Sequence, residues 1–230
     1  IIGLDKANKN EFEFAKKYFS ILKTSHSILW NDGPRLLKLQ NELNEAELAN
    51  VEDGKGKNVW YCIGYAISRN SAEAVAFHDC DIKTYDENIL IKLFYPLLND
   101  SMGYSFSKGY YPRYANNKFN GRVTRLLVTP LIKSLIKLFG NNDYLEFIDS
   151  FRYPLAGEYA LKKNLLRDLR IPSDWGLEIG ILSELQRSYS SKLCCQVDLA
   201  DHYDHKHQDL SEDDKSKGLS RMTIDITKAF

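Results

Sequence analysis

The stretch AEAVAFHDCDI, residues 72–82, is the third of three β-strand signals in the first half of the chain. The first two are IIGLD, residues 1–5, and HSILWND, residues 26–32. Segments with helical spacing of apolar residues follow the strand signals or lie between them, namely residues 9–22, 34–48 and 59–70. This β-α-β-α-β alternation predicts an α/β fold with an open sheet covered by helices.

The second half of the chain is more mixed. Residues 104–114 alternate like a β-strand, and residues 122–140 read as one long helix despite Pro130. Residues 171–189 begin with a helix-start signal, and KLCCQVDLADHYDHKH, residues 192–207, reads as a strand that runs into three histidines. A charged linker and a short terminal helix are expected over the last 20 residues.

Composition and charge narrow the functional classes. Of the 230 residues, 43% are hydrophobic and 27% charged, and Lys+Arg and Asp+Glu balance at 31 each, which argues against nucleic acid or an anionic membrane as a partner. No apolar run has the length of about 20 residues that a membrane span needs. The cysteines show no CxxC spacing, so we expect reduced, buried thiols in a cytoplasmic protein; they are Cys62, Cys80, Cys194 and Cys195.

Two carboxylates follow the third strand signal. In open α/β sheets ligands bind at the carboxyl ends of strands, and on extended backbone Asp79 and Asp81 would project to the same side. Two hard oxygen donors suit Mg²⁺ or Mn²⁺ carried by a diphosphate. A solvated strand end and the nucleophile pair of a haloacid dehalogenase-type phosphatase are the alternatives. Lys83, in place of the Thr or Val expected there, disfavours the phosphatase.

Two further features are candidates for ligand binding. Three of the five histidines, His202, His205 and His207, lie within six residues and could serve a zinc scaffold or lend one imidazole to a carboxylate-bound cation. GKGKN, residues 54–58, lacks the P-loop pattern, but its lysine could reach a phosphate while the glycines let the backbone approach. A flexible loop is the alternative for this segment.

Together these motifs resemble the glucosyl-3-phosphoglycerate synthases, which are retaining glycosyltransferases of the GT-A fold. The resemblance runs from Ile1 to about Leu210 and rests on seven motifs in order: GKG at 54–56, DxD at 79–81, FSKGYYPR at 106–113, GRVTRLLVTPL at 121–131, FRYPLAGEYAL at 151–161, PSDWGLEIG at 172–180 and YDHKHQ at 203–208.

The resemblance implies a Rossmann-like α/β fold, the nucleotide-diphospho-sugar transferase type, with an open mixed sheet flanked by helices. We expect the family's first strand, with its Pro/Asn/Glu-containing turn, to precede Ile1 and to be missing from this chain. A single catalytic domain is expected over residues 1–210, with a nucleotide-sugar half at about 1–100 and an acceptor half at about 101–210. Residues 211–230 would form a tail with a helix.

On the donor side, the resemblance implies a metal held by Asp81 and His205, with Asp79 in the metal shell or on the ribose. Glu178 would position the substrate near the sugar and acceptor. The remaining nucleotide-sugar contacts would come from Lys55, Cys80, Leu155, Ala156 and Gly157.

On the acceptor side, the resemblance implies that Arg122 is a fork for the anionic groups of 3-phosphoglycerate. With Glu178 and Asp81, Arg122 would be one of the catalytic residues. The other acceptor contacts would come from Gly121, Val123, Thr124, Trp175 and His207. Trp175 would pack beside Glu178 on the same helix face.

The resemblance therefore implies glucose transfer from a nucleotide-diphosphate donor, UDP-glucose, to 3-phosphoglycerate with retention and with Mg²⁺ or Mn²⁺ as cofactor. The product would be glucosyl-3-phosphoglycerate, the precursor of the compatible solute glucosylglycerate. We expect a cytoplasmic homodimer. The alternatives are a related transferase for mannose or another acceptor, and a non-catalytic module that binds nucleotide sugars.

Overall fold

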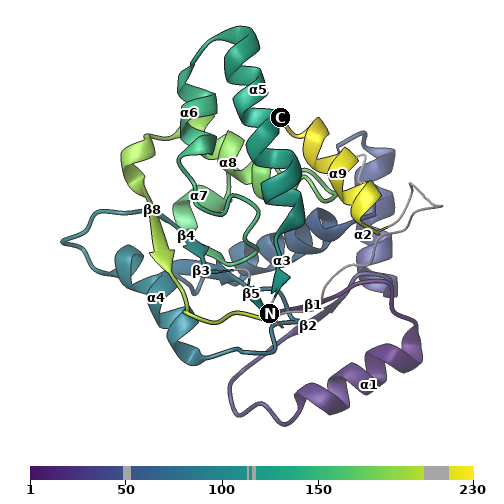
Figure 1. Ribbon diagram of the computed structural model, residues 1–230. Helices are drawn as coiled ribbons and strands as arrows, with labels where there is room; N and C mark the ends of the chain where they lie inside the picture. Colours follow the sequence, from purple (N-terminus) through teal and green to yellow (C-terminus); the bar gives the residue numbers. More distant parts are fainter. Residues whose placement is uncertain (49–52, 113, 116–117, 205–217) are drawn as a thin grey trace. The chain divides into compact units, whose positions relative to one another are not determined.

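The computed structural model describes residues 1–48, 53–112, 114–115, 118–204 and 218–230 (Figure 1). The chain divides into two units, one formed by Ile1–Ser71 with Pro172–Asp174 and the other by Ala72–Ile171 with Trp175–Phe230. Throughout these described ranges, no helix combines the length and apolar character needed to cross a membrane.

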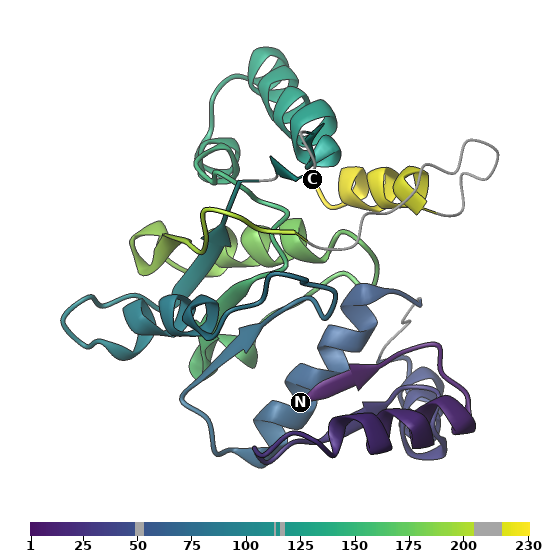
Figure 2. The same cartoon turned by 60° about the horizontal axis from the view of Figure 1, so that its bottom comes forward.

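The first unit is built on two short parallel strands. Strands β1 (Ile2–Leu4) and β2 (Ile28–Trp30) pair in parallel, and α1 (Lys9–Phe19) connects them. Two more helices complete the unit, α2 (Pro34–Glu45) and α3 (Lys55–Arg69). The turned view in Figure 2 shows β1 lying along α3, in agreement with their contacts. The unit is thus a small parallel α/β layer, as the alternation of strand and helix signals predicts.

The start of α1 illustrates how local sequence sets an element. The Asn8 side chain accepts hydrogen bonds from the backbone N–H groups of Asn10 and Glu11, at 2.8 and 3.1 Å. The Glu11 carboxylate in turn accepts from the Asn8 N–H at 2.7 Å, which completes a capping box.

The second unit contains a four-stranded mixed sheet in the order β3-β7-β4-β8. Strand β7 pairs antiparallel with both β3 and β4, whereas β4 and β8 run parallel. The strands are β3 (Ala74–Phe77), β4 (Phe106–Tyr110), β7 (Tyr159–Lys162) and β8 (Cys194–Asp198). The first three strands of the chain are therefore divided between two sheets, because β3 pairs with a strand that begins more than 80 residues later.

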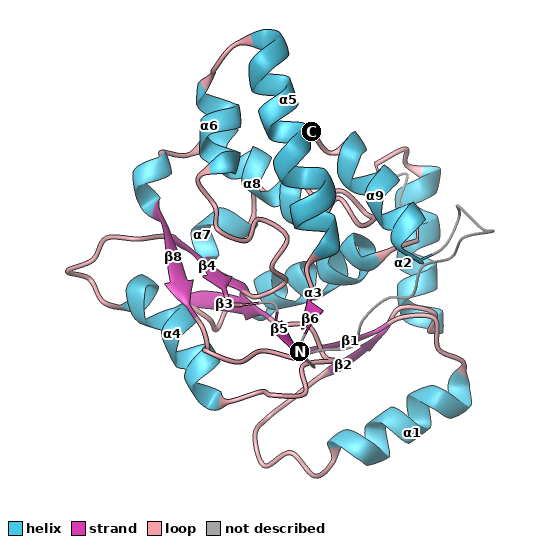
Figure 3. Ribbon diagram, viewed as in Figure 1, coloured by secondary structure: helices cyan, strands magenta, loops and turns pink. Residues whose placement is uncertain are grey.

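Both faces of this sheet are covered. Helix α4 (Glu87–Leu98) lies along one face, where Leu93 and Leu97 pack in a buried cluster with Ala160 of β7 (Figure 3). The neighbours of Ala160 in the strand, Tyr159 and Leu161, point to the opposite face and are fully buried as well. The core of the unit therefore extends through the sheet on both sides.

A long helical segment leaves the sheet region. It starts at residue 122, includes a π-helical turn η1 (Thr124–Val128), and continues as α5 (Thr129–Phe139). Pro130 is the second residue of α5, directly after the π-helical turn, and the helical segment runs through it, as expected. Helix α6 (Asp143–Asp149) packs against both α5 and α8 (Leu177–Ser188).

The remaining elements of the second unit are short. A small antiparallel pair and three helical segments complete it: β5 (Tyr114–Ala115), β6 (Lys118–Phe119), α7 (Lys163–Leu166), η2 (Ser191–Leu193) and the terminal helix α9 (Gly218–Lys228).

The cysteines differ from the expectation in one respect. All four are free thiols, as expected, but none is fully buried, and Cys80 is exposed because it lies in the turn after β3. Burial still raises the pKa of the half-buried Cys195 thiol to about 11, since the charged thiolate is poorly solvated there.

Candidate functional site

The two aspartates of the DxD motif lie in the loop after β3. Asp79 and Asp81 follow Phe77, the last residue of the strand, by two and four positions. Cys80 and Asp81 form a turn, so the extended backbone that we assumed for this pair is wrong. Asp79 is half-buried and Asp81 is exposed. The pair therefore sits where the strand direction predicts, but the turn and not the strand sets how the two carboxylates point.

The DxD loop lies against the turn that contains Leu155, Ala156 and Gly157. A Cβ atom added to Gly157 would come within 2.5 Å of Asp79 Oδ2 and 2.7 Å of Asp79 Cγ. A larger residue at position 157 would force the Asp79 carboxylate or the turn to shift, because real Cβ contacts do not come that close. The structure thus brings one expected metal residue together with the expected donor-sugar turn, across 78 residues of sequence.

A buried lysine holds this turn from the sheet side. Lys108 of β4 is 2% exposed, and its Nζ donates to the Ala156 carbonyl at 2.6 Å. The ammonium also lies 5.0 Å from the ring centre of Tyr159, a cation–π contact. Sequence reasoning missed Lys108. The sequence feature that could have indicated it is a lysine within the alternating strand pattern FSKGY, residues 106–110.

The segment before the expected metal histidine is tied to the loop that follows the DxD motif. The Lys83 N–H donates to the Asp204 carbonyl at 2.8 Å, and the Asp204 N–H donates to Thr84 Oγ1 at 3.0 Å. Lys83 Nζ also lies 3.4 Å from Asp204 Oδ2. His205 and His207 themselves lie outside the described residues.

A buried aromatic pair extends from this segment. The rings of Tyr111 and Tyr203 stack with their centres 3.6 Å apart, and Tyr111 Oη donates to Glu158 Oε2 at 2.7 Å. Burial, reinforced by the Glu158 charge, raises the pKa of both phenols well above the usual range, so they stay neutral hydrogen-bonding groups. Tyr111, Glu158 and Tyr203 were not predicted, because no local pattern distinguishes them from ordinary core residues.

The donor atoms at the DxD loop fit a hard divalent cation. Mg²⁺ is usually bound by one or two carboxylates together with substrate phosphates and water, and Asp79 and Asp81 offer such carboxylates beside an accessible turn. Within the described ranges no group of three or more His, Cys, Asp or Glu side chains is placed to hold a metal. A metal here would accordingly take its remaining ligands from elsewhere.

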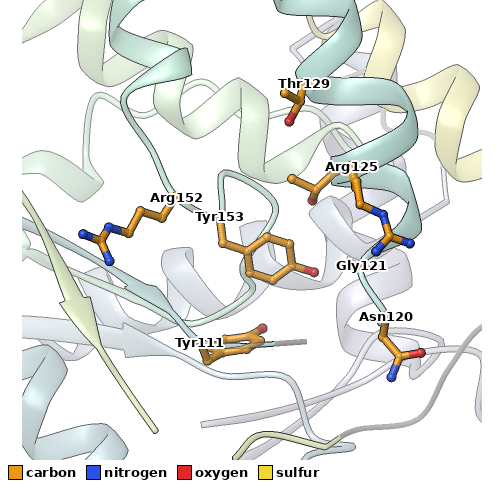
Figure 4. A pocket seen from close by; sticks show the side chains of 8 residues that line it. Tyr111, Asn120, Gly121, Arg125, Thr129, Arg152 and Tyr153 are labelled. Carbon is orange, nitrogen blue, oxygen red and sulfur yellow. The ribbon is translucent and has the colours of Figure 1, made fainter. Parts of the chain in front are cut away.

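A cavity of about 280 Å³ opens at the start of the long helical segment (Figure 4). Gly121 has a φ of 71°, in the left-handed region that suits glycine, and the helix begins immediately after it. The described lining residues are Tyr111, Asn120, Gly121, Thr124, Arg125, Thr129, Arg152 and Tyr153. Two of the four expected GRVT residues are among them.

The other two GRVT residues are placed differently. Arg122 is exposed, Val123 is half-buried, and neither belongs to the described lining of the cavity. Arg125, which was not predicted, lines it instead. Arg125 follows Gly121 by four positions, about one helical turn, and this spacing could have indicated that both line the same site.

The GKGKN segment, in the first unit, has a role in packing. Lys55 is the first residue of α3 and is half-buried. The N–H groups of Gly56 and Lys57 donate to the carbonyls of Asp174 and Ser173, at 3.3 and 2.9 Å. The expectation that this backbone approaches a phosphate is therefore wrong for Gly56 and Lys57, since protein carbonyls already occupy these donors.

Glu178 and Trp175 lie on either side of a helix start. Glu178 is in the first turn of α8 and is 5% exposed. Trp175 is half-buried and precedes the helix, because Gly176 is the N-cap residue. Our expectation that the two side chains share a helix face is therefore wrong.

Comparison with known proteins gives matches that extend over the whole of this chain. No protein-family model matches the chain. Glucosyl-3-phosphoglycerate synthase of Persephonella marina is 43% identical over 230 residues, covering all of this chain and 57% of the relative. The synthase of Methanococcoides burtonii is 39% identical over 234 residues, covering all of this chain and 56% of the relative. The family resemblance that the motifs indicated is confirmed, and the chain spans somewhat more than half the length of these relatives.

Solved structures give the same fold. Glucosyl-3-phosphoglycerate synthase from Mycobacterium tuberculosis in complex with phosphoglyceric acid matches with a TM-score of 0.68 and 23% identity, over 98% of this chain and 65% of that one. Its complex with Mn²⁺, uridine diphosphate and glucosyl-3-phosphoglycerate matches equally well. At this identity the match shows the fold, and the expected GT-A class with a mixed sheet flanked by helices is confirmed.

Proposed function

Because this chain is similar over all of its 230 residues to glucosyl-3-phosphoglycerate synthases, we propose that it carries out the same reaction. Glucose is transferred from a nucleotide-diphosphate donor, UDP-glucose, to 3-phosphoglycerate with retention of configuration. The product is glucosyl-3-phosphoglycerate, for glucosylglycerate synthesis.

The contact between Gly157 and the Asp79 carboxylate carries this proposal. A diphosphate-sugar donor needs its phosphates and its sugar held side by side, and here the DxD loop and the 155–157 turn touch. Lys108 fixes the Ala156 carbonyl from behind, which keeps the turn in one conformation. Such preorganisation lowers the cost of ordering the donor on binding.

Asp81 and Asp79 would hold Mg²⁺ or Mn²⁺, which when bound neutralises the charge that develops on the departing diphosphate. We assign His205 as the third protein ligand, since Asp204 before it is hydrogen-bonded to the loop just past Asp81. Lys55 and Cys80 contact the nucleotide in this assignment.

The protein's contribution to the chemistry is then orientation and electrostatics. Backbone groups of Leu155, Ala156 and Gly157 bind glucose hydroxyls, and Glu178 positions the sugar and the acceptor without acting as a nucleophile. The acceptor hydroxyl attacks from the face that the diphosphate leaves, and a departing phosphate oxygen takes its proton. Near-attack positioning of this kind supplies a large share of enzymatic rate enhancement.

The acceptor binds at the start of the long helical segment in this proposal. Gly121 and Thr124 line the cavity there, and the first amide groups of a helix are natural ligands for a phosphate. Arg122, Val123, Trp175 and His207 complete the acceptor site.

The decisive experiment supplies UDP-glucose, 3-phosphoglycerate and Mn²⁺ or Mg²⁺ to the protein and identifies the product by mass spectrometry and NMR. We expect glucosyl-3-phosphoglycerate from the wild type and a loss of at least about a hundredfold in kcat in Asp81→Ala. Asp100→Ala, which removes an exposed aspartate outside the site, should keep full activity. Turnover with a mannose donor and none with any glucose donor would favour the related mannosyl transferase.

A non-catalytic binding module and a zinc scaffold make different predictions. Calorimetry of UDP binding with and without Mg²⁺ should show metal-dependent binding that Asp81→Ala abolishes. Equal binding by both proteins would argue for the module. One zinc ion per chain in the purified protein would favour the scaffold. The homodimer, the cytoplasmic location and the link to compatible-solute synthesis stay predictions.

A further inference from the structure

We propose that Glu158 is a positioning residue for the metal site. It joins two segments that both contact the loop of the DxD motif, residues 78–86, and so fixes the direction of the motif's carboxylates. One segment is the 155–157 turn and the other is the pair Tyr203–Asp204. The inference rests on the proposed function, in which Asp79 and Asp81 hold the cation.

The two segments hold the loop at two places. Gly157 packs against the Asp79 carboxylate, since a Cβ atom at position 157 would come within 2.5 Å of Oδ2. Farther along the loop, the Lys83 N–H donates to the Asp204 carbonyl at 2.8 Å, and the Asp204 N–H donates to Thr84 Oγ1 at 3.0 Å. The placement of the motif between these contacts therefore depends on where residues 157 and 204 lie.

Glu158 is anchored through both its backbone and its side chain. It is 1% exposed. Its carbonyl accepts a hydrogen bond from the Gly109 N–H of β4 at 2.8 Å, and its Oε2 accepts one from Tyr111 Oη at 2.7 Å. Gly157 is its neighbour in the chain, so the anchoring of Glu158 also fixes the end of the turn that lies against Asp79.

Glu158 acts on the second segment through Tyr203. The Tyr203 ring is buried and stacks on the ring of Tyr111, which Glu158 holds by its hydroxyl. Burial, then the Glu158 charge and more weakly the Asp79 charge, raise the pKa of the Tyr203 phenol. This phenol thus lies within electrostatic reach of both carboxylates, and the next residue, Asp204, is bonded to the loop.

A carboxylate is a costly choice for such a buried position. An ionised group is buried without great loss only where hydrogen bonds and neighbouring charges compensate for lost water, whereas a glutamine would offer Tyr111 an acceptor at lower cost. Groups behind a metal's ligands carry such requirements, because they orient the ligands and tune the site. Their replacement typically weakens metal binding or activity 10- to 100-fold.

The test measures UDP binding by calorimetry over a series of Mn²⁺ concentrations, which needs no turnover. In Glu158→Gln we expect the Mn²⁺ concentration for half-maximal UDP binding to rise about 10- to 100-fold. Tyr203→Phe removes one hydroxyl and keeps the ring. It should raise this concentration about three- to tenfold, as for the loss of one hydrogen bond.

Glu184→Gln and Tyr144→Phe are the matched controls, since they make the same chemical changes in the same unit outside the proposed site. Glu184 Oε2 accepts a hydrogen bond from Arg187 at 2.7 Å, and Tyr144 Oη lies 3.0 Å from Ser183 Oγ. Both controls should lose some stability in urea unfolding and keep the Mn²⁺ dependence of the wild type. Circular dichroism without metal checks that each variant is folded.

The outcomes separate this inference from the proposed function. If UDP binding by the wild type needs Mn²⁺ and Glu158→Gln has the same Mn²⁺ dependence, or the controls weaken it as much, Glu158 is a core residue only and the inference is overturned. If Glu158→Gln does not fold, Tyr203→Phe decides in the same way.

The proposed function has its own readout. If the variants weaken Mn²⁺-dependent UDP binding as expected but the wild type forms no glucosyl-3-phosphoglycerate, the proposed reaction fails and the positioning role of Glu158 stands. UDP binding by the wild type that does not depend on Mn²⁺ would overturn both.

Discussion

At the scale of single residues, Gly157 lies against a carboxylate of the proposed site. Gly157→Ala places a methyl group 2.5 Å from Asp79 Oδ2, so either the carboxylate or the turn must move. We expect a destabilisation of about 1–3 kcal/mol, typical of overpacking, and at least about tenfold weaker metal-dependent UDP binding. Urea unfolding and calorimetry measure the two effects.

A double-mutant cycle tests whether Asp79 is the cause. If the collision is with this carboxylate, Gly157→Ala should cost much less stability in an Asp79→Ala background than in the wild type. Additive effects would mean that the methyl group strains the turn itself and that the contact with Asp79 is incidental.

His78 is expected to make the stability of the protein depend on pH. Its ring lies edge-on to Tyr85, with both nitrogens buried and without hydrogen-bond partners among the described residues. Burial lowers its pKa, although the neighbouring Asp79 charge opposes the shift. The unfolded chain, with a histidine pKa of about 6.5, therefore takes up the proton first, and stability falls as pH drops below about 6.5.

The measurement is urea unfolding of wild type and His78→Gln at pH 7.5 and pH 5.5. The wild type should lose more stability over this interval than the variant does. His26→Gln, which removes a histidine from the first unit, should behave like the wild type. An equal pH dependence in His78→Gln and wild type would show that His78 does not carry it.

At the scale of elements, α3 shows why two glycines in one helix differ. A Cβ at Gly56 would lie 1.8 Å from the Pro172 carbonyl oxygen, a backbone atom that cannot turn aside, whereas a Cβ at Gly64 meets no described atom within 4 Å. Gly56→Ala should therefore destabilise the protein by about 1–3 kcal/mol. Gly64→Ala should stabilise it by roughly 0.5–1 kcal/mol, the usual gain inside a helix.

Chemical unfolding followed by circular dichroism compares these two variants directly, since they carry the same substitution in the same helix. Equal stabilities would mean that the 172–174 segment does not pack on α3 as the structure has it. A loss of UDP binding in Gly56→Ala without any loss of stability would instead restore the phosphate-binding interpretation of the GKGKN segment.

The elements were more predictable than the contacts between them. The spacing of apolar residues was enough to predict α3. The strand before Asp79 is evident from its β-branched and aromatic residues. The contact of Gly157 with Asp79 and the hydrogen bond from Lys108 to Ala156 join positions 48 or more residues apart. Local propensity carries no information on such pairs. The resemblance to a family assigned Asp79 and Gly157 to the same donor site, but nothing in the sequence analysis predicted the contact of Lys108 with Ala156.

At the scale of the whole molecule, most of the proposed site belongs to one unit. The DxD loop, the 155–157 turn, the cavity and Glu178 all lie within residues 72–171 and 175–230, whereas Lys55 lies in the first unit. The large unit, which is built around one mixed sheet, thus holds the proposed metal, sugar and acceptor groups in its loops and helices. Ligand binding should therefore stabilise the fold around that sheet.

The last prediction uses this coupling. A ligand that binds only the folded state adds about 2.7 kcal/mol of stability at 100 times its Kd, which raises Tm by roughly 5–10 °C in a protein of this size. We expect UDP with Mn²⁺ to produce such a shift and UDP with EDTA to produce almost none, because the cation joins the diphosphate to Asp79 and Asp81. Asp81→Ala should abolish the metal-dependent part, while Asp100→Ala should keep it. A shift from UDP that survives both EDTA and Asp81→Ala would place the nucleotide on the protein without the DxD loop, and the proposed donor site would be wrong.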